Sequence, residues 1–188
     1  MRVVDLSDRE ADAGLIESCR RGDRRAFRAL YDLYKDRVYS IAFYFFHGDA
    51  STARDATQQV FLKLIANIGR FRAQAAFSTW LYRLVVNVCL DEARSRKPRP
   101  ASGAFRAEAL AVADSQEEDF ARAETAARVR AAIAALPPKF RIAVLMRYFD
   151  DLSYEEMAKA LRCSMGTVAS RLSRSHKMLA ERLKVLVE

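Results

Sequence analysis

One predicted helix presents an amide and several cations on a single side. This helix lies within residues 71–96. Successive residues of an α-helix are rotated by about 100°, so residues three or four positions apart lie on the same side. Amide and guanidinium groups form hydrogen bonds with base edges and phosphates, and the aromatic rings of Phe71 and Trp80 in the same stretch can stack on unpaired bases. The side chains on this side are Arg83, Asn87, Leu90 and Arg94. Together they indicate a surface for single-stranded nucleic acid.

The opposite side of this predicted helix is apolar. Ser78 is of a type favoured at the N-cap, and an apolar stripe with the i, i+3, i+4, i+7 spacing of a core-facing helix follows it. The stripe consists of Leu81, Leu84, Val85 and Val88. The same residues therefore also fit a packed helix with aromatic neighbours and an exposed basic end, and both interpretations stay open at this point.

A second motif with recognition chemistry lies in residues 152–179. Ser153 and Glu156 form a capping box, a tight turn follows at Arg162, and Ser164 can cap a last helix. Two short amphipathic helices joined by such a turn predict a helix-turn-helix, in which the second helix enters a DNA major groove. Its exposed positions near the start of that helix are Thr167, Ser170, Arg171 and Arg174. A purely structural helical hairpin is the alternative.

A third surface is predicted on a helix from about residue 51 to residue 68. One side of this helix carries the apolar residues of a core. The other side carries an acid, two amides and an apolar residue, namely Asp55, Gln58, Gln59 and Leu62. An exposed Leu ringed by polar groups fits a protein-binding site, although single surface leucines are also common without any function.

Composition restricts the classes of protein to consider. The 188 residues suffice for one or two small domains, and no apolar run approaches the ~18 residues of a membrane span, so we expect no insertion into a membrane. The net charge of +8 permits nucleic-acid binding. Residues 162–184 carry six Lys/Arg and one acid, whereas residues 101–127 carry two Arg and six acids. A basic C-terminal module therefore follows an acidic segment.

Enzymatic chemistry is not expected. His47 and His176 lie far apart in the sequence without a matching acid or thiol constellation, and there is no phosphate-binding loop or HExxH pair. Three widely spaced cysteines form neither a disulfide framework nor a metal-ligand pattern. We therefore expect no cofactor and no metal. The polar, acidic start is not a secretion signal, and a reducing cytoplasm is the expected location.

The elements that position these surfaces are predicted to be almost entirely helical. Glycine is scarce, alternating β-branched strands are absent, and Ala, Leu, Arg and Glu dominate. Pro98, Pro100 and Gly103 open a small, polar and acidic stretch that predicts a flexible linker. The expected fold is all-α, with two small helical domains at residues 1–97 and 125–188, a linker at 98–124, and the helix-turn-helix in the C-terminal domain.

Four motifs in order resemble a known family. They read GDRRAF, DATQQVF, FRAQAAFSTWLYRLVVN, and ALPPKFRIAVLMRYFDDLSYEEMA followed by GTVASRLSRS. The chain is similar across its length to the extracytoplasmic-function (ECF) sigma factors of bacteria. The resemblance implies a subunit that binds core RNA polymerase, recognises and opens the −10 promoter element through its N-terminal domain, and recognises the −35 element through its helix-turn-helix. It also implies control by an anti-sigma factor.

The resemblance assigns roles to particular residues. The helix side with Asp55, Gln58, Gln59 and Leu62 matches the site that docks on the polymerase clamp. Lys63, Asn67, Phe71 and Asn87, with the loop at residues 73–77, match family positions that face −10 DNA. To these the helix surface described above adds Trp80, Arg83 and Arg94. Those assigned to −35 DNA are Thr167, Ser170, Arg171, Arg174 and Lys177. A helix-turn-helix regulator that acts without being a polymerase subunit is the alternative.

The sequence departs from the family pattern at three informative positions. Gln59 stands where Glu is usual, which removes one charge from the predicted clamp site. Ala73 stands where Gly is common, which narrows the conformations of the −10 loop. Arg162 occupies a turn position where Gly is common, and left-handed backbone geometry there costs a non-glycine residue ~1 kcal/mol.

Overall fold

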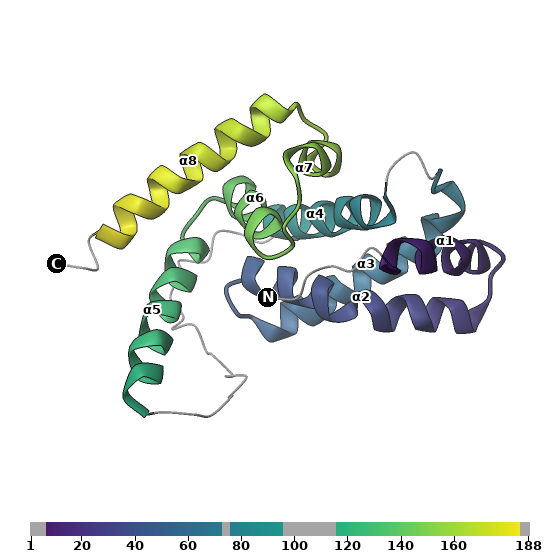
Figure 1. Ribbon diagram of the computed structural model, residues 1–188, viewed down its shortest axis with the longest axis horizontal. Coiled ribbons are helices and arrows are strands. Elements are labelled where there is room, and N and C mark those ends of the chain that lie inside the picture. Colours follow the sequence, from purple (N-terminus) through teal and green to yellow (C-terminus); the bar gives the residue numbers. More distant parts are fainter. Residues whose placement is uncertain (1–6, 73–75, 96–115, 185–188) are drawn as a thin grey trace.

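Helices make up the regular structure of the protein. The computed structural model describes residues 7–72, 76–95 and 116–184, and within these ranges the chain contains no β-strand. This arrangement confirms the predicted all-α fold (Figure 1). The elements are α1 (Ser7–Arg20), α2 (Arg24–Phe45), α3 (Ala50–Asn67), the short 3-10 helix η1 (Ile68–Arg70), α4 (Phe77–Ser95), α5 (Gln116–Ala134), α6 (Pro138–Tyr148), α7 (Tyr154–Leu161) and α8 (Met165–Lys184).

The helices from α1 to α4 form what we call the N-terminal region. The carboxylate of Asp23 caps α2 by accepting hydrogen bonds from the backbone N–H groups of Arg25 and Ala26. α2 packs against α3 and α4 through buried residues such as Leu30 and Leu64. α4 begins at Phe77, which makes Ala76 its N-cap, so the predicted N-cap at Ser78 is wrong by two positions and this serine lies inside the helix.

The helices from α5 to α8 form what we call the C-terminal region. The capping box is present, because Ser153 Oγ accepts from the Glu156 N–H while the Glu156 carboxylate accepts from the Ser153 N–H. α7 ends at Leu161, and the next residue, Arg162, has a φ of 51° and a ψ of 50°, which are left-handed as predicted. Ser164 Oγ then accepts from the N–H of Thr167 at the start of α8. Local sequence signals therefore locate both helices of the predicted helix-turn-helix.

The predicted linker lies only partly within the described residues. Of the range 98–124, residues 98–115 fall outside them, and α5 already begins at Gln116. The sequence pattern predicts helix from near Phe120, within four residues of this start. The segment QEEDFARAE is rich in Glu and Ala, which favour helix.

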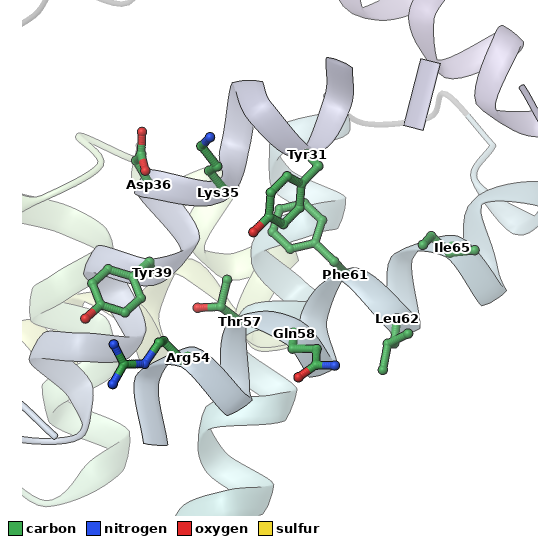
Figure 2. A pocket seen from close by; sticks show the side chains of 10 residues that line it. All are labelled: Tyr31, Lys35, Asp36, Tyr39, Arg54, Thr57, Gln58, Phe61, Leu62 and Ile65. Carbon is green, nitrogen blue, oxygen red and sulfur yellow. The ribbon is translucent and has the colours of Figure 1, made fainter. Parts of the chain in front are cut away.

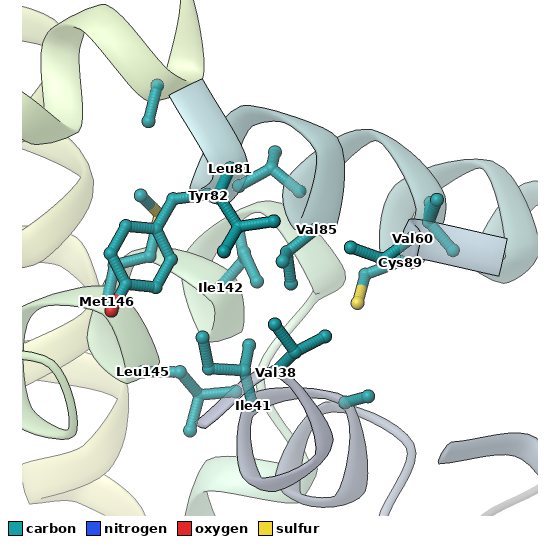
Figure 3. Packing of buried hydrophobic residues seen from close by; sticks show 14 of the residues in the cluster. Val38, Ile41, Val60, Leu81, Tyr82, Val85, Cys89, Ile142, Leu145 and Met146 are labelled. Carbon is teal, nitrogen blue, oxygen red and sulfur yellow. The ribbon is translucent and has the colours of Figure 1, made fainter. Parts of the chain in front are cut away.

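The two regions pack directly on each other. α4 contacts α6 and α7, and α2 contacts α5 and α6. Val38, Ile41, Tyr82 and Val85 from the N-terminal region meet Ile142, Leu145 and Met146 from α6 (Figure 3). Buried apolar residues of both regions thus form one continuous core. No helix in the described ranges is both long enough and apolar enough to cross a membrane.

Candidate functional site

The predicted clamp site is an exposed side of α3. Asp55, Gln58, Gln59 and Leu62 are all exposed, as the helical spacing predicts. Leu62 leaves 51% of its surface accessible, and so does Ile65 one turn further along. The structure therefore brings the four predicted residues together and adds a second exposed aliphatic side chain. The i, i+3 spacing of Leu62 and Ile65 is the signal that sequence reasoning missed.

A groove of about 450 Å³ lies beside this side of α3, between α2 and α3 (Figure 2). Its floor is aromatic, because Tyr31 from α2 packs edge-on against Phe61 from α3 with 4.7 Å between ring centroids. Its rim is polar, with Lys35 and Asp36 on α2 and Gln58 on α3. An apolar floor with a polar rim is the usual anatomy of a protein-binding surface.

The aromatic residues before and within α4 form a cluster. Phe71 lies 5.5 Å from Phe77 and 5.6 Å from Trp80, measured between ring centroids. Phe71 is buried, with 8% of its surface exposed, while Trp80 is partly buried. In this arrangement Phe71 contributes to the core, and Trp80 is the ring of the pair with accessible surface. Residues 73–75 of the predicted loop lie outside the described residues.

The other residues assigned to −10 DNA lie along α3 and α4. Lys63 and Asn67 are partly buried, and the Asn67 amide donates to the Lys63 carbonyl at 2.8 Å. Asn87 is exposed. Arg94 is also exposed, and its guanidinium forms an ion pair with Asp91 at 2.9 Å. The predicted amide and cation stripe of α4 is therefore on the surface at its C-terminal end.

Arg83 occupies a different environment from the rest of the stripe. Its Nη2 donates to the backbone carbonyl of Lys159 in α7 at 2.9 Å. Its Nε is buried and forms no hydrogen bond with the described residues. Arg83 therefore contacts the C-terminal region, which the sequence did not predict.

The residues assigned to −35 DNA lie on one side of α8. Ser170, Arg174 and Lys177 are exposed, and Thr167 and Arg171 are partly buried. Beneath them Ser175 is buried and donates from Oγ to the Arg171 carbonyl at 2.7 Å. The structure thus places the five predicted residues on the surface of the second helix of the helix-turn-helix.

The two predicted DNA surfaces border a single groove. This groove has a volume of about 500 Å³ and lies between α4 and the C-terminal region. Asn87 and Arg94 line it from α4, and Arg162 and Arg171 line it from the helix-turn-helix. Residues predicted to recognise different promoter elements therefore lie side by side.

A buried carboxylate connects the two regions. Asp150 follows α6, and 3% of its side chain is exposed. Its Oδ1 accepts from the Tyr82 hydroxyl at 2.9 Å and lies 3.6 Å from the Arg37 guanidinium. Its Oδ2 is buried without a hydrogen-bond partner among the described residues. Burial raises the pKa of Asp150 to about 6, against the lowering effects of Tyr82 and Arg37.

A buried guanidinium forms a second connection. Arg141 in α6 donates to the carbonyls of Ala134 and Leu136 within its own region, and to the carbonyl of Phe45 at the end of α2 at 2.6 Å. Burial lowers the pKa of Arg141 to about 10, so the group remains charged at neutral pH. Partial desolvation of the ring and the charge of Arg141, whose Nη1 lies 3.0 Å from His47 Nε2, lower the pKa of His47 to about 4. His47 is therefore neutral near pH 7.

Within the part of the chain that the structure describes, no three His, Cys, Asp or Glu side chains are grouped to hold a metal ion. The described surfaces offer hydrogen-bond donors, cations and apolar side chains. Such groups bind nucleic acid and protein.

Two family models match the chain. Residues 30–99 match Sigma-70 region 2, and residues 126–179 match Sigma-70 region 4. The first match spans most of α2 together with α3 and α4. The second spans the C-terminal part of α5, all of α6 and α7, and most of α8.

Curated relatives match nearly the full length. The RNA polymerase sigma-H factor of Pseudomonas aeruginosa is 35% identical over 187 residues, covering 95% of this chain and 96% of the relative. The ECF RNA polymerase sigma factor SigW of Bacillus subtilis is 33% identical, covering 91% and 96%. The ECF RNA polymerase sigma-E factor of Escherichia coli K12 is 32% identical, covering 97% and 99%.

Two solved structures share the fold. CnrH in complex with the cytosolic domain of CnrY is 23% identical, with a TM-score of 0.69 and coverage of 93% of this chain and 98% of that one. The sigma factor RpoE of Bartonella quintana in complex with the anti-sigma factor NepR is 24% identical, with a TM-score of 0.62 and coverage of 85% and 97%.

Proposed function

Because the chain belongs to the ECF sigma factors, RNA polymerase subunits that direct promoter-specific initiation, we propose that its two regions divide promoter recognition between them. The N-terminal unit, residues 1–97, binds core polymerase and recognises and opens the −10 element. The C-terminal unit, residues 125–188, recognises the −35 element. The observation that carries this division is the order of two distinct surfaces along the chain, the exposed side of α3 first and the helix-turn-helix second.

The polymerase clamp docks on α3 in this proposal. Leu62 and Ile65 supply exposed apolar surface that is buried on docking, and Asp55, Gln58 and Gln59 supply the polar surround. The aromatic floor between α2 and α3 extends the apolar area. Because this surface lies away from α5–α8, core polymerase can reach it while the two regions are in contact.

The −10 strand binds along α4 in this proposal. Asn87 supplies an amide for a base edge and Arg94 a cation for phosphate, and Lys63 and Asn67 of α3 and Arg83 of α4 supply further polar groups. Trp80 supplies an accessible ring for stacking. Extracting a base from the duplex costs a few kcal/mol, which stacking and hydrogen bonds offset. Phe71 supports Trp80 from the core unless the cluster rearranges around DNA.

Replacing Arg171 with Ala tests the −35 assignment. If the guanidinium pairs with a base edge, we expect a loss of ~1–3 kcal/mol in binding at one −35 base pair and a relaxed preference there. Holoenzyme affinity is measured on a set of promoters that differ at each −35 position. Arg128→Ala, which removes an exposed arginine from α5, is the matched control. Equal weakening on every sequence would show a phosphate contact instead.

An anti-sigma factor regulates the chain in this proposal. Both fold neighbours, CnrH and the Bartonella sigma factor, were solved in complexes, the first with the cytosolic domain of CnrY and the second with the anti-sigma factor NepR. The exposed apolar groove beside α3 offers a surface on which such a partner and core polymerase would compete. The protein acts with polymerase in the cytoplasm and catalyses no reaction of its own.

Binding to purified core polymerase distinguishes a sigma factor from a helix-turn-helix regulator that acts without polymerase. The full chain is expected to form a one-to-one complex with core and to bind promoter duplex specifically only within that complex. A helix-turn-helix regulator would instead bind duplex tightly without polymerase, and it would leave the exposed side of α3 without a partner. Tight, specific duplex binding combined with no core binding would refute the proposal.

A further inference from the structure

We propose that the groove between α4 and the C-terminal region is a binding site for a nucleotide that carries two or more phosphate groups. The groove has a volume of about 500 Å³, which lies within the ~300–1,000 Å³ range of small-molecule sites. One part of its lining is cationic and another part is apolar. This combination matches the polyphosphate and the base of a single ligand.

Four cations line the groove, and they come from different elements. Arg94 lies on α4, Lys139 in the first turn of α6, Arg162 in the turn after α7 and Arg171 on α8. Among the described residues, no Asp or Glu side chain lines the groove beside them. The groove therefore concentrates positive charge where the two regions meet.

Little of this charge is neutralised by the chain itself. The two arginines of the helix-turn-helix have no partner for their guanidinium groups among the described residues. Arg94 pairs with Asp91 at 2.9 Å, but 75% of the Arg94 side chain is exposed and stays accessible to a ligand. Lys139 is exposed as well. Packing of the regions thus brings like charges together, and a polyanion bound between them relieves the repulsion.

The small size of the groove favours linked phosphates over an acidic peptide. A terminal phosphate offers three acceptor oxygens and about two negative charges, whereas a carboxylate offers two oxygens and one charge. Linked phosphates therefore place several charges within a few Å of one another. Guanidinium groups also bind phosphate through paired hydrogen bonds, which adds geometric specificity.

The rest of the lining suits a nucleobase. It is apolar apart from Asn87, and it includes Leu90 of α4, Leu161 of α7 and Pro137 at the start of α6, all partly buried. A flat base covers apolar surface of this kind, and the Asn87 amide can donate to and accept from a base edge. Inorganic polyphosphate would leave this part of the groove without contacts. A nucleotide uses both parts.

A ligand in this groove acts on the arrangement of the two regions. The site exists only while the regions are packed together, because its residues come from both. A ligand that binds only this arrangement stabilises it as the ligand concentration exceeds the dissociation constant. The ligand also covers Asn87 and Arg171. It therefore opposes promoter recognition by the free chain, a consequence that rests on the proposed function, whereas the binding itself does not.

Titration of the full free chain with ATP tests the site. ATP, tripolyphosphate and adenosine are each titrated by isothermal calorimetry at about 0.1 M salt without divalent cations. We expect one ATP to bind per chain, at least about tenfold more tightly than tripolyphosphate or adenosine, because only ATP contacts both parts of the lining. Absence of saturable ATP binding would overturn the proposal, and so would tripolyphosphate that binds as tightly as ATP.

Arg162→Gly removes one cation of the groove without straining the turn. The φ of 51° at this position is one that glycine adopts freely, and the Arg162 side chain is exposed. We expect the affinity for ATP to fall about five- to tenfold, because charge-assisted hydrogen bonds to phosphate are lost. Lys139→Ala, also at an exposed position, is expected to weaken ATP binding in the same direction. Unchanged affinity in both variants would show that ATP binds elsewhere.

Arg28→Ala is the matched control for these two variants. Arg28 is an exposed arginine of α2 that pairs with Asp32 and does not line the groove. This variant should bind ATP as tightly as the unaltered chain does. A loss equal to that of Arg162→Gly would show general attraction to a basic protein, which contradicts a defined site.

Leu90→Ala separates the contribution of the base from that of the phosphates. The smaller side chain leaves less apolar surface for the base, so the affinity for ATP should fall about three- to tenfold while the affinity for tripolyphosphate stays the same. A short polyglutamate peptide is the last comparison. If it displaced ATP at equal concentration, the groove would be a site for acidic peptides and the nucleotide assignment would be wrong. No polymerase or DNA is present, so these results are independent of the proposed promoter function.

Discussion

Replacing Leu62 with Asp is expected to weaken the binding of this chain to core RNA polymerase by at least about tenfold. Leu62 is 51% exposed on α3, next to the aromatic floor between α2 and α3. Complete burial of a leucine side chain contributes ~1.5–3 kcal/mol, of which about half remains for Leu62, and ~1.4 kcal/mol corresponds to a factor of ten in affinity. The variant also brings a carboxylate into the interface. The dissociation constant of the complex with core polymerase is the measurement.

Leu33→Asp is the matched control for this prediction. Leu33 is similarly exposed, at 46%, but it lies on α2 and does not line the groove. Both leucines are exposed in the free chain, so neither substitution should reduce helix content or thermal stability greatly. If both variants lost affinity equally, the loss would come from charge in general and the assignment of the α3 surface to the clamp would be wrong.

Replacing Asn87 with Ala is expected to slow promoter opening by about ten- to a hundredfold. If the amide holds an extracted base through two hydrogen bonds, its loss removes ~1–3 kcal/mol from the open complex. Because Asn87 is exposed in the described structure, the fold should be unaffected. Fluorescence of a base analogue placed in the −10 element reports opening by holoenzyme containing this variant.

The affinity of the Asn87→Ala variant for core polymerase provides its control. We expect this affinity to be unchanged, since Asn87 lies on α4 away from the exposed side of α3. An equal loss of core binding would place Asn87 in the packing of the N-terminal region. A normal rate of opening would instead remove Asn87 from the −10 site.

Much of the fold follows from local sequence signals. The capping box of Ser153 and Glu156 and the left-handed turn at Arg162 depend on residues within a few positions of one another. The exposed sides of α3 and α8 follow from helical spacing in the same way. Short-range signals of this kind therefore predict where the helices and the helix-turn-helix lie, and which residues share each exposed side of a helix.

The contacts between the two regions were beyond local reasoning. Tyr82 and Asp150 are separated by 68 positions, and Arg83 and Lys159 by 76. In the sequence Asp150 reads as an ordinary turn residue and Arg83 as one more cation of the DNA stripe. Only the packing of α4 against the C-terminal region gives them buried partners and different roles.

Phe71 illustrates a different limit. An aromatic residue just before a helix is equally compatible with stacking on bases and with packing in a core, because the same apolar face of the ring makes both kinds of contact. The structure shows Phe71 packed against Phe77 and Trp80.

The central claim is that this chain directs core polymerase to promoters with two elements, one recognised by each region. Sequencing the 5′ ends of transcripts made from a genomic library by purified core plus this chain tests it most directly. We expect start sites whose aligned upstream sequences contain one shared −35 element and one shared −10 element. In this account, Arg171→Ala relaxes only the first, and Asn87→Ala impairs only opening at the second. Absence of specific start sites, together with no binding to core polymerase, would contradict it.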